Sequence, residues 1–95
     1  MVKDKIMENM YEQARLLQRQ NNINEAIRIF EQISIVEYSK GKIGLFLRLG
    51  NLYESVDLYG KAIDAYKRAL TIARSLGNKK AENYISYTML GLIED

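Results

Sequence analysis

The chain has 95 residues, of which 47% are hydrophobic and 27% are charged, and its formal net charge is +2. A chain of this length makes one small domain, and so low a charge gives no strong attraction to nucleic acid or to an anionic membrane. Cysteine and histidine are absent, which removes disulfides, thiol nucleophiles and the commonest general base and metal ligand. No apolar run is long enough for a signal peptide or a membrane span, so we expect a soluble, cytoplasmic protein.

Apolar residues at three- and four-residue intervals predict helices along the whole chain. The first spans about residues 5–20 and ends at Asn21-Asn22, two residues that tolerate left-handed backbone. The second runs from Ile23 to about Lys40, and Gly41 follows it as a typical residue after a helix end.

The second half of the chain predicts three further helices, at about 42–56, 59–76 and 79–95. Gly77 ends the fourth helix, and Asn78 is placed to cap the fifth. Every connection is short, so successive helices should be antiparallel neighbours. Within the buried faces of the third and fourth helices, small residues should allow the partner backbone to come close. These are Gly50, Ala62 and Ala69.

The apolar pattern repeats along the chain, at a shift of 36 residues between the first two helix pairs and 41 residues between the third and fifth helices. Ala26, Ile27, Phe30 and Gly41 recur as Ala62, Ile63, Tyr66 and Gly77, and Phe46, Leu49 and Gly50 recur as Tyr87, Leu90 and Gly91. Such a period predicts an all-α domain of stacked helix pairs. We expect one domain over 1–95, with repeats at about 5–41 and 42–77 and a half repeat at 78–95.

The central repeat resembles the tetratricopeptide repeat in the order and spacing of its aromatic, Leu-Gly, tyrosine and alanine positions. These positions are Phe46, Leu49, Gly50, Tyr53, Ala62, Tyr66 and Ala69. The ending over 69–78, which lacks the usual proline, is similar to the longer repeats of kinesin light chains and G-protein signalling modulators. The resemblance implies a right-handed superhelical stack of antiparallel helix pairs that binds proteins and has no catalytic activity.

In tetratricopeptide folds the first helix of each pair lines a concave face, and the resemblance places a partner-binding groove on the matching positions here. These are Tyr11, Arg15, Gln18, Arg19, Leu47, Arg48, Asn51, Glu54, Ser55, Thr88 and Leu92. Such a surface could hold a peptide, with Asn51 bonding its backbone and the arginines meeting its carboxylates. An ordinary polar surface is the alternative for any one of these residues.

The fifth helix is apolar around most of its circumference, and a helix of that kind expects burial on all sides. We therefore expect either that the protein continues beyond Asp95 or that two copies pair, or swap this helix, through residues 79–95. The residues proposed for self-association are Tyr84, Ile85, Met89, Leu92 and Ile93. The alternative is that only tyrosine tips and methionine edges are exposed, as on many monomers.

No constellation of residues favours catalysis. Asp57 and Asp64, and Glu94 with Asp95, are acidic pairs outside any apolar pocket, and Gly41–Gly44 is too short for a phosphate loop. The basic residues near the loops are better explained as solvated charge at helix ends than as a nucleic-acid site. They are Lys40, Lys42, Arg74, Lys79 and Lys80.

We accordingly expect no enzyme activity, no cofactor, no metal, and no nucleic-acid or membrane partner. Two functions remain: an interaction scaffold that binds a protein or peptide in its groove, or a regulatory or assembly segment of a larger protein that self-associates through its last helix.

Overall fold

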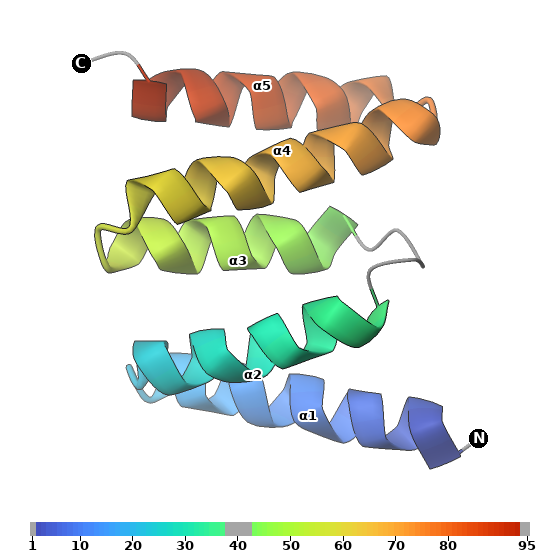
Figure 1. Ribbon diagram of the computed structural model, residues 1–95, viewed down its shortest axis with the longest axis vertical. Coiled ribbons are helices and arrows are strands. Elements are labelled where there is room, and N and C mark those ends of the chain that lie inside the picture. The colour runs from blue at the N-terminus through green and yellow to red at the C-terminus, as the bar shows by residue number, and fades with distance from the viewer. Residues whose placement is uncertain (1, 38–42, 94–95) are drawn as a thin grey trace. The chain divides into compact units, whose positions relative to one another are not determined.

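The computed structural model describes residues 2–37 and 43–93, and within them it contains five α-helices and no strand. The helices are α1 (Val2–Arg19), α2 (Ile23–Glu37), α3 (Ile43–Ser55), α4 (Tyr59–Ser75) and α5 (Lys79–Ile93) (Figure 1). The predicted all-α fold and its five helices are confirmed. The main difference is that α1 begins at Val2, ahead of the predicted residue 5. The predicted helix stop at Gly41 lies outside the described residues.

The chain divides into two compact units, Met1–Ser39 and Lys40–Asp95. In the first unit α1 packs against α2. In the second, α4 packs against both α3 and α5 (Figure 1).

Three helices end with the same backbone geometry. Asn21, Asp57 and Gly77 have φ values of 65°, 63° and 66°. At each end, the next residue donates its N–H to a carbonyl five residues earlier: Asn22 to Leu17 at 2.8 Å, Leu58 to Tyr53 at 2.8 Å and Asn78 to Ala73 at 2.9 Å. This is the Schellman motif, which satisfies carbonyls that the helix leaves open. It confirms the predicted stops at Asn21-Asn22 and Gly77.

The core of the first unit is formed by apolar residues of α1 and α2. Ala14, Ala26 and Phe30 are 0% exposed. The Phe30 ring meets the Tyr11 ring edge to face, with centroids 5.2 Å apart. The small alanines allow the two helices to approach, and the aromatic pair fills the space beside them.

The α3–α4 interface is the most tightly packed part of the second unit. A Cβ atom at Gly50 would lie 2.4 Å from Cε1 of Tyr66, far inside van der Waals contact. Only glycine fits there, because the Tyr66 side chain is 0% exposed and has no room to retreat. The sequence therefore predicted the need for a small residue correctly, but the close neighbour is a tyrosine ring and not the partner backbone.

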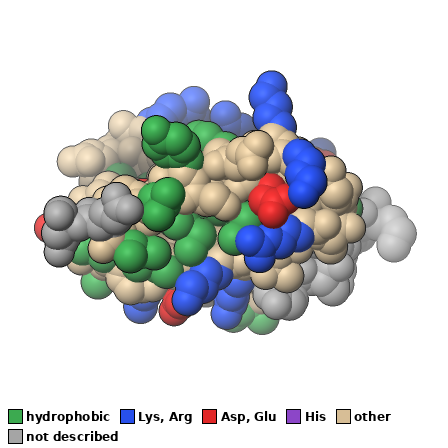
Figure 2. Space-filling view, turned by 90° about the horizontal axis from the view of Figure 1, so that it is seen from above, with side chains coloured by type: hydrophobic (Ala, Val, Ile, Leu, Met, Phe, Trp, Pro, Cys, Tyr) green, Lys and Arg blue, Asp and Glu red, His purple; other side chains and the backbone are tan. Residues whose placement is uncertain are grey.

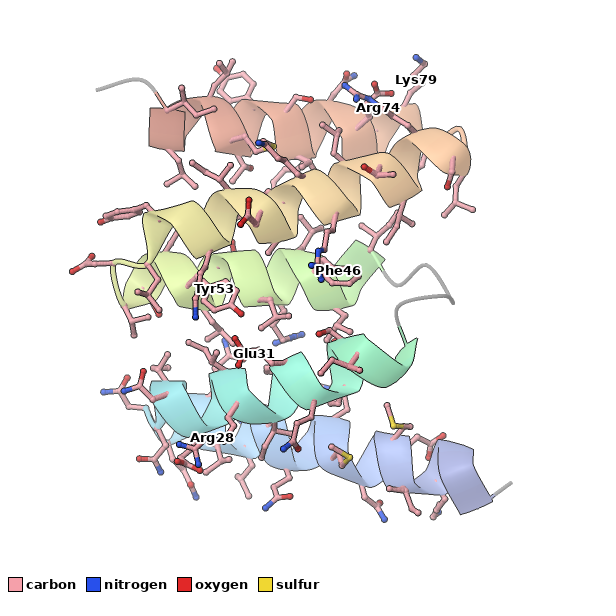
Figure 3. The ribbon with its side chains drawn as sticks, viewed as in Figure 1. Arg28, Glu31, Phe46, Tyr53, Arg74 and Lys79 are labelled. Atoms are coloured by element: carbon pink, nitrogen blue, oxygen red, sulfur yellow. The ribbon has the colours of Figure 1, made fainter. Side chains whose placement is uncertain are left out.

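Two cations of α4 lie over aromatic rings of α3. Lys61 Nζ is 5.9 Å from the Tyr53 centroid, and the Arg68 guanidinium carbon is 5.9 Å from the Phe46 centroid. Figure 3 marks Phe46 and Tyr53 on α3. Both rings are nearly fully buried, so the cations cover the edge of the interface with their long side chains.

Helix α5 has a capped start and one buried side. Asn78 Oδ1 accepts the N–H of Ala81 at 3.0 Å, which confirms the predicted cap. The buried residues of α5 are Ile85 and Met89, one turn apart. Because α4 is the helix that packs against α5, these two residues form the α5 side of that contact.

Candidate functional site

The predicted binding residues of α3 follow one side of the helix, and this side is open. Leu47, Arg48 and Glu54 are partly exposed, and Asn51 and Ser55 are exposed. The side of α3 that meets α4 contrasts with it, since Phe46, Leu49 and Tyr53 are all at most 7% exposed. The five residues therefore form a mixed apolar and polar strip beside a packed interface, which we call the α3 strip.

A buried tyrosine of α4 holds two residues of the α3 strip. The Tyr66 hydroxyl lies 2.6 Å from Asn51 Oδ1 and also donates a short hydrogen bond to Glu54 Oε2. The hydroxyl has a single proton, so it serves both partners fully only if the Asn51 amide turns its NH2 group toward the tyrosine oxygen. Burial, followed by the hydrogen bond to Glu54, raises the pKa of Tyr66, so the phenol stays protonated.

The hydroxyl groups among the predicted residues are used within their own helices. Ser55 Oγ donates to the carbonyl of Leu52 at 2.7 Å, and Thr88 Oγ1 donates to that of Tyr84 at 2.9 Å. Leu92, also on α5, is partly buried. These contacts leave Asn51, Glu54 and Leu47 as the side chains best placed for a ligand on the second unit.

The remaining predicted binding residues lie on α1, in the first unit. Arg15 forms an ion pair with Glu12 at 3.3 Å in which both side chains are well exposed. Arg19 is exposed, while Tyr11 and Gln18 are partly buried. An exposed ion pair of this kind is weak, so Arg15 can exchange its partner for a ligand carboxylate at little cost.

The predicted self-association surface on α5 needs correction. Ile85 and Met89 are 0% and 9% exposed, because they form the inner side of the helix. The large hydrophobic residues of α5 that are more than half exposed are Tyr84 (58%), Tyr87 (81%), Leu90 (51%) and Ile93 (60%). Figure 2, seen from above with α5 nearest the viewer, shows hydrophobic side chains gathered on this side. Tyr84, Tyr87, Leu90 and Gly91 lie on one side of the helix and form a surface that we call the α5 face, whereas Ile93, two residues after Gly91, lies on a different side.

The repeat pattern of the sequence already indicated which residues of α5 lie on its outer side, but the residues predicted for self-association were not chosen from that pattern. Tyr87, Leu90 and Gly91 match Phe46, Leu49 and Gly50 at the 41-residue shift, and on α3 these positions meet the next helix. Tyr87 and Leu90 therefore belong on the outer side, where a following helix would pack.

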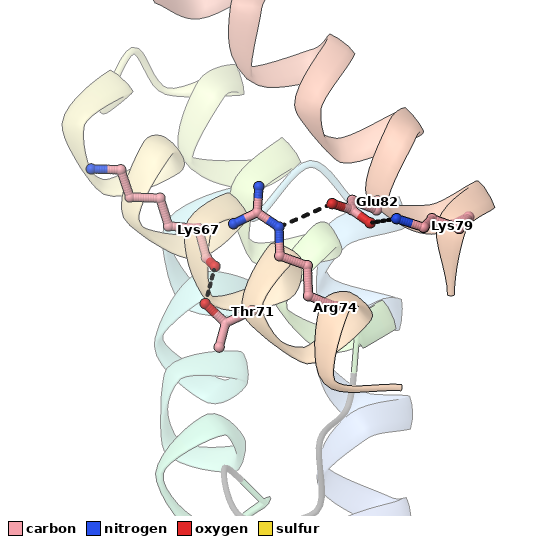
Figure 4. Close-up of polar contacts among 5 residues, drawn as sticks. All are labelled: Lys67, Thr71, Arg74, Lys79 and Glu82. Carbon is pink, nitrogen blue, oxygen red and sulfur yellow. Dashed lines mark hydrogen bonds and ion pairs between the residues drawn. The ribbon is translucent and has the colours of Figure 1, made fainter. Parts of the chain in front are cut away.

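The basic residues at the α4–α5 junction are partly neutralised by one carboxylate. Glu82 accepts from Arg74 Nε at 3.0 Å and pairs with Lys79 at 3.6 Å (Figure 4). The hydrogen bond from Arg74 is the main reason why the pKa of Glu82 is lowered. On the next turn of α4 toward its start, Thr71 Oγ1 donates to the Lys67 carbonyl at 3.0 Å. Lys40 and Lys42, the other members of the predicted basic group, lie outside the described residues.

Within 2–37 and 43–93 there is no cluster of three acidic residues that could bind a metal ion. Of the acidic pairs considered from the sequence, Asp57 accepts the hydroxyl of Tyr59 at 2.9 Å, and Glu94 and Asp95 lie outside the described residues. None of the described helices is long and apolar enough to cross a membrane.

Comparisons with known proteins agree with this fold. The tetratricopeptide repeat family matches residues 45–80, which cover α3, α4 and the start of α5. A solution structure of a tetratricopeptide repeat domain protein from Salinibacter ruber is 27% identical with a TM-score of 0.76, over 90% of this chain and 85% of that one. A crystal structure of a tetratricopeptide repeat domain protein from the same organism is 27% identical with a TM-score of 0.72, over 90% and 93%.

No curated protein sequence matches the chain. The chain is thus similar in fold to tetratricopeptide repeat domains, and its residues 45–80 match one such repeat.

Proposed function

We propose that the chain is a protein–protein interaction scaffold without catalytic activity, which binds a peptide or protein on the first helices of its repeats. Tetratricopeptide repeats generally act in this way, and the match over residues 45–80 supports the proposal. The ending of the repeat at 69–78 further favours the longer form resembling kinesin light chains. We place the protein in the cytoplasm, with no nucleic-acid or membrane partner.

The observation that best supports the proposal is that the Tyr66 hydroxyl bonds to two residues of the α3 strip. Asn51 and Glu54 are accessible on the surface, yet the Tyr66 hydroxyl fixes both in position. A side chain that is ordered before binding loses less conformational entropy when a ligand arrives. Asn51 keeps further donor and acceptor capacity for a peptide backbone, and Leu47 offers an apolar contact beside it.

The test is capture of partners from a cell extract by the immobilised chain, read by mass spectrometry. Alanine at Arg15, Leu47 and Asn51 together should abolish capture of any specific partner and leave the circular dichroism spectrum and oligomeric state unchanged. The matched control carries alanine at Lys67 and Thr71, two exposed residues of α4, and should capture as the parent does. Equal capture by all three proteins would overturn the proposal.

We propose as a second function that the chain assembles with another helix through the α5 face. The observation that favours it is the exposure of three large hydrophobic side chains, Tyr84, Tyr87 and Leu90, on one side of α5. Single exposed apolar residues are common on monomers, but a contiguous group usually marks an interaction surface.

A further inference from the structure

The α5 face repeats the side of α3 on which α4 packs, but it is uncovered in the described part of the chain. Phe46 and Leu49 are 1% and 3% exposed, whereas their counterparts Tyr87 and Leu90 are 81% and 51% exposed. Equivalent positions on two helices of one unit are thus buried where a helix packs across from them and exposed where none does among the described residues.

The glycines at these positions show the same contrast. A Cβ atom at Gly50 would collide with the Tyr66 ring, whereas one at Gly91 would meet nothing within 4 Å. On α3, Gly50 leaves room for the aromatic ring of Tyr66 from the opposing helix. On α5 no atom of the described residues occupies the corresponding space beside Gly91, which lies one helical turn from the exposed Tyr87.

We propose that two copies of this chain pair through their α5 faces, antiparallel, with Tyr87 of each copy over Gly91 of the other. This inference rests on the second function proposed above and names its partner. Residues 87 and 91 lie on one side of the helix. In an antiparallel pair that crosses at the level of residue 89, each is opposite the other, so the ring-on-glycine contact forms twice. Such an interface is self-complementary, as a two-fold dimer requires.

Charge favours the antiparallel arrangement over the parallel one. Lys79 and Lys80 stand at the start of α5, and Figure 2 shows lysine and arginine side chains concentrated toward that end of the face. Parallel helices would bring these charges together. An antiparallel pair that crosses at the level of residue 89 places them roughly 27–30 Å apart along the helix axis, beyond the screening length of physiological salt.

The exposed area indicates a weak dimer. An aromatic side chain presents about 150–250 Å² when fully exposed, so Tyr84, Tyr87 and Leu90 offer roughly 350 Å² per copy. A pair would then bury about 700 Å², below the range of stable specific interfaces and within that of weak, transient ones. We therefore expect a dissociation constant above about 10 μM, with dimer forming reversibly as concentration rises.

Sedimentation equilibrium of the full chain between 10 and 500 μM tests the proposal. The average mass should rise toward that of a dimer and fall again on dilution. Leu90→Ser should weaken the dimer at least about tenfold. Leu16→Ser is the matched control, because Leu16 on α1 is 47% exposed against 51% for Leu90, and it should leave the dissociation constant unchanged.

A second pair of variants separates loss of pairing from loss of folding. Gly91→Ala should raise the melting temperature of the monomer, since alanine favours the helix, yet weaken the dimer about tenfold or more by filling the space that Tyr87 of the other copy would occupy. Gly60→Ala, also on a helix and with an open Cβ position, should leave the dimer unchanged.

Three results would overturn the α5 pair. They are a monomer at 500 μM, equal weakening by Leu16→Ser and Leu90→Ser, and a dimer that persists on dilution or tolerates Gly91→Ala, as a swapped dimer would. If the chain is monomeric but Leu90→Ser abolishes capture of a different protein, the second proposed function stands and its partner is not a second copy.

Discussion

Gly50→Ala is the substitution for which the structure predicts the largest effect for the smallest change. The added Cβ atom would lie 2.4, 2.7 and 2.8 Å from three carbons of the Tyr66 ring. Ordinary contact begins near 3.4 Å, so the ring or the helix must shift by about 1 Å. The ring is fully buried and its hydroxyl is bonded to Asn51 and Glu54, so neither end of Tyr66 can yield freely.

Two opposing terms set the magnitude. Overpacking a core costs about 1–3 kcal/mol, and the anchored ring places this site near the upper value. Alanine recovers about 0.5–1 kcal/mol through its better helix propensity. The net loss is about 2 kcal/mol, which lowers the melting temperature of a domain of this size by roughly 8–16 °C.

Urea and thermal unfolding followed by circular dichroism measure this loss at low protein concentration. Gly60→Ala is the control, because its Cβ atom meets nothing, and it should be neutral or slightly stabilising. In a Tyr66→Leu background the ring is absent, so Gly50→Ala should lose most of its cost. The reasoning is refuted if Gly50→Ala melts at or above the parent, or if its cost is the same without the ring.

Further predictions concern single residues and are checked by the same unfolding experiments. Ala62→Leu should cost about 1–3 kcal/mol or more, because Ala62 is 0% exposed in the helix contact. Tyr66→Phe should cost about 1–2 kcal/mol through the lost hydrogen bond to a carboxylate, and an unchanged midpoint would contradict that bond. Gly77→Ala should cost about 1 kcal/mol from backbone strain alone, since φ is +66° and the site is open. Because the pKa of Glu82 is lowered in the folded state, its carboxylate stabilises the fold above the usual pKa near 4.5. This stabilisation is lost as the pH falls through the lowered pKa of the folded state. Glu82→Gln should therefore be less stable than the parent at pH 7, and the difference should disappear once the pH has fallen below the folded pKa of Glu82.

The helices and their ends followed from the sequence because both depend on local rules. Apolar spacing marks a helix, and residues such as Gly77 and Asn21 mark where left-handed backbone ends it. Asp57 adopts the same conformation 36 residues after Asn21, which matches the predicted repeat shift. The small residue at Gly50 was also predictable, because one close contact at a fixed spacing suffices to identify it.

The exposed residues of α5 were predicted less accurately than the helices, because the exposure of a residue depends on which side of its helix a neighbouring helix packs. The residues predicted for self-association on α5 included Ile85 and Met89, which are buried, and omitted Tyr87 and Leu90, which are exposed. The hold of Tyr66 on Asn51 and Glu54 was likewise not predicted, because it joins residues 15 and 12 positions apart across two helices. To predict such contacts one must know how each helix is rotated about its own axis. The spacing of apolar residues does not define that rotation to within one side chain.

The repeat pattern does indicate which side of a helix is covered, once each repeat position is matched to the helix that it contacts. On α3, Phe46 and Leu49 are buried because α4 follows, and the same two positions on α5 are bare within the described residues. The outer side of α5 is therefore indicated by the inner positions of α3, the corresponding helix of the preceding repeat. We therefore propose that Tyr87 and Leu90 belong to an interface with another helix, and the open position at Gly91 leads us to expect that this helix contributes an aromatic ring.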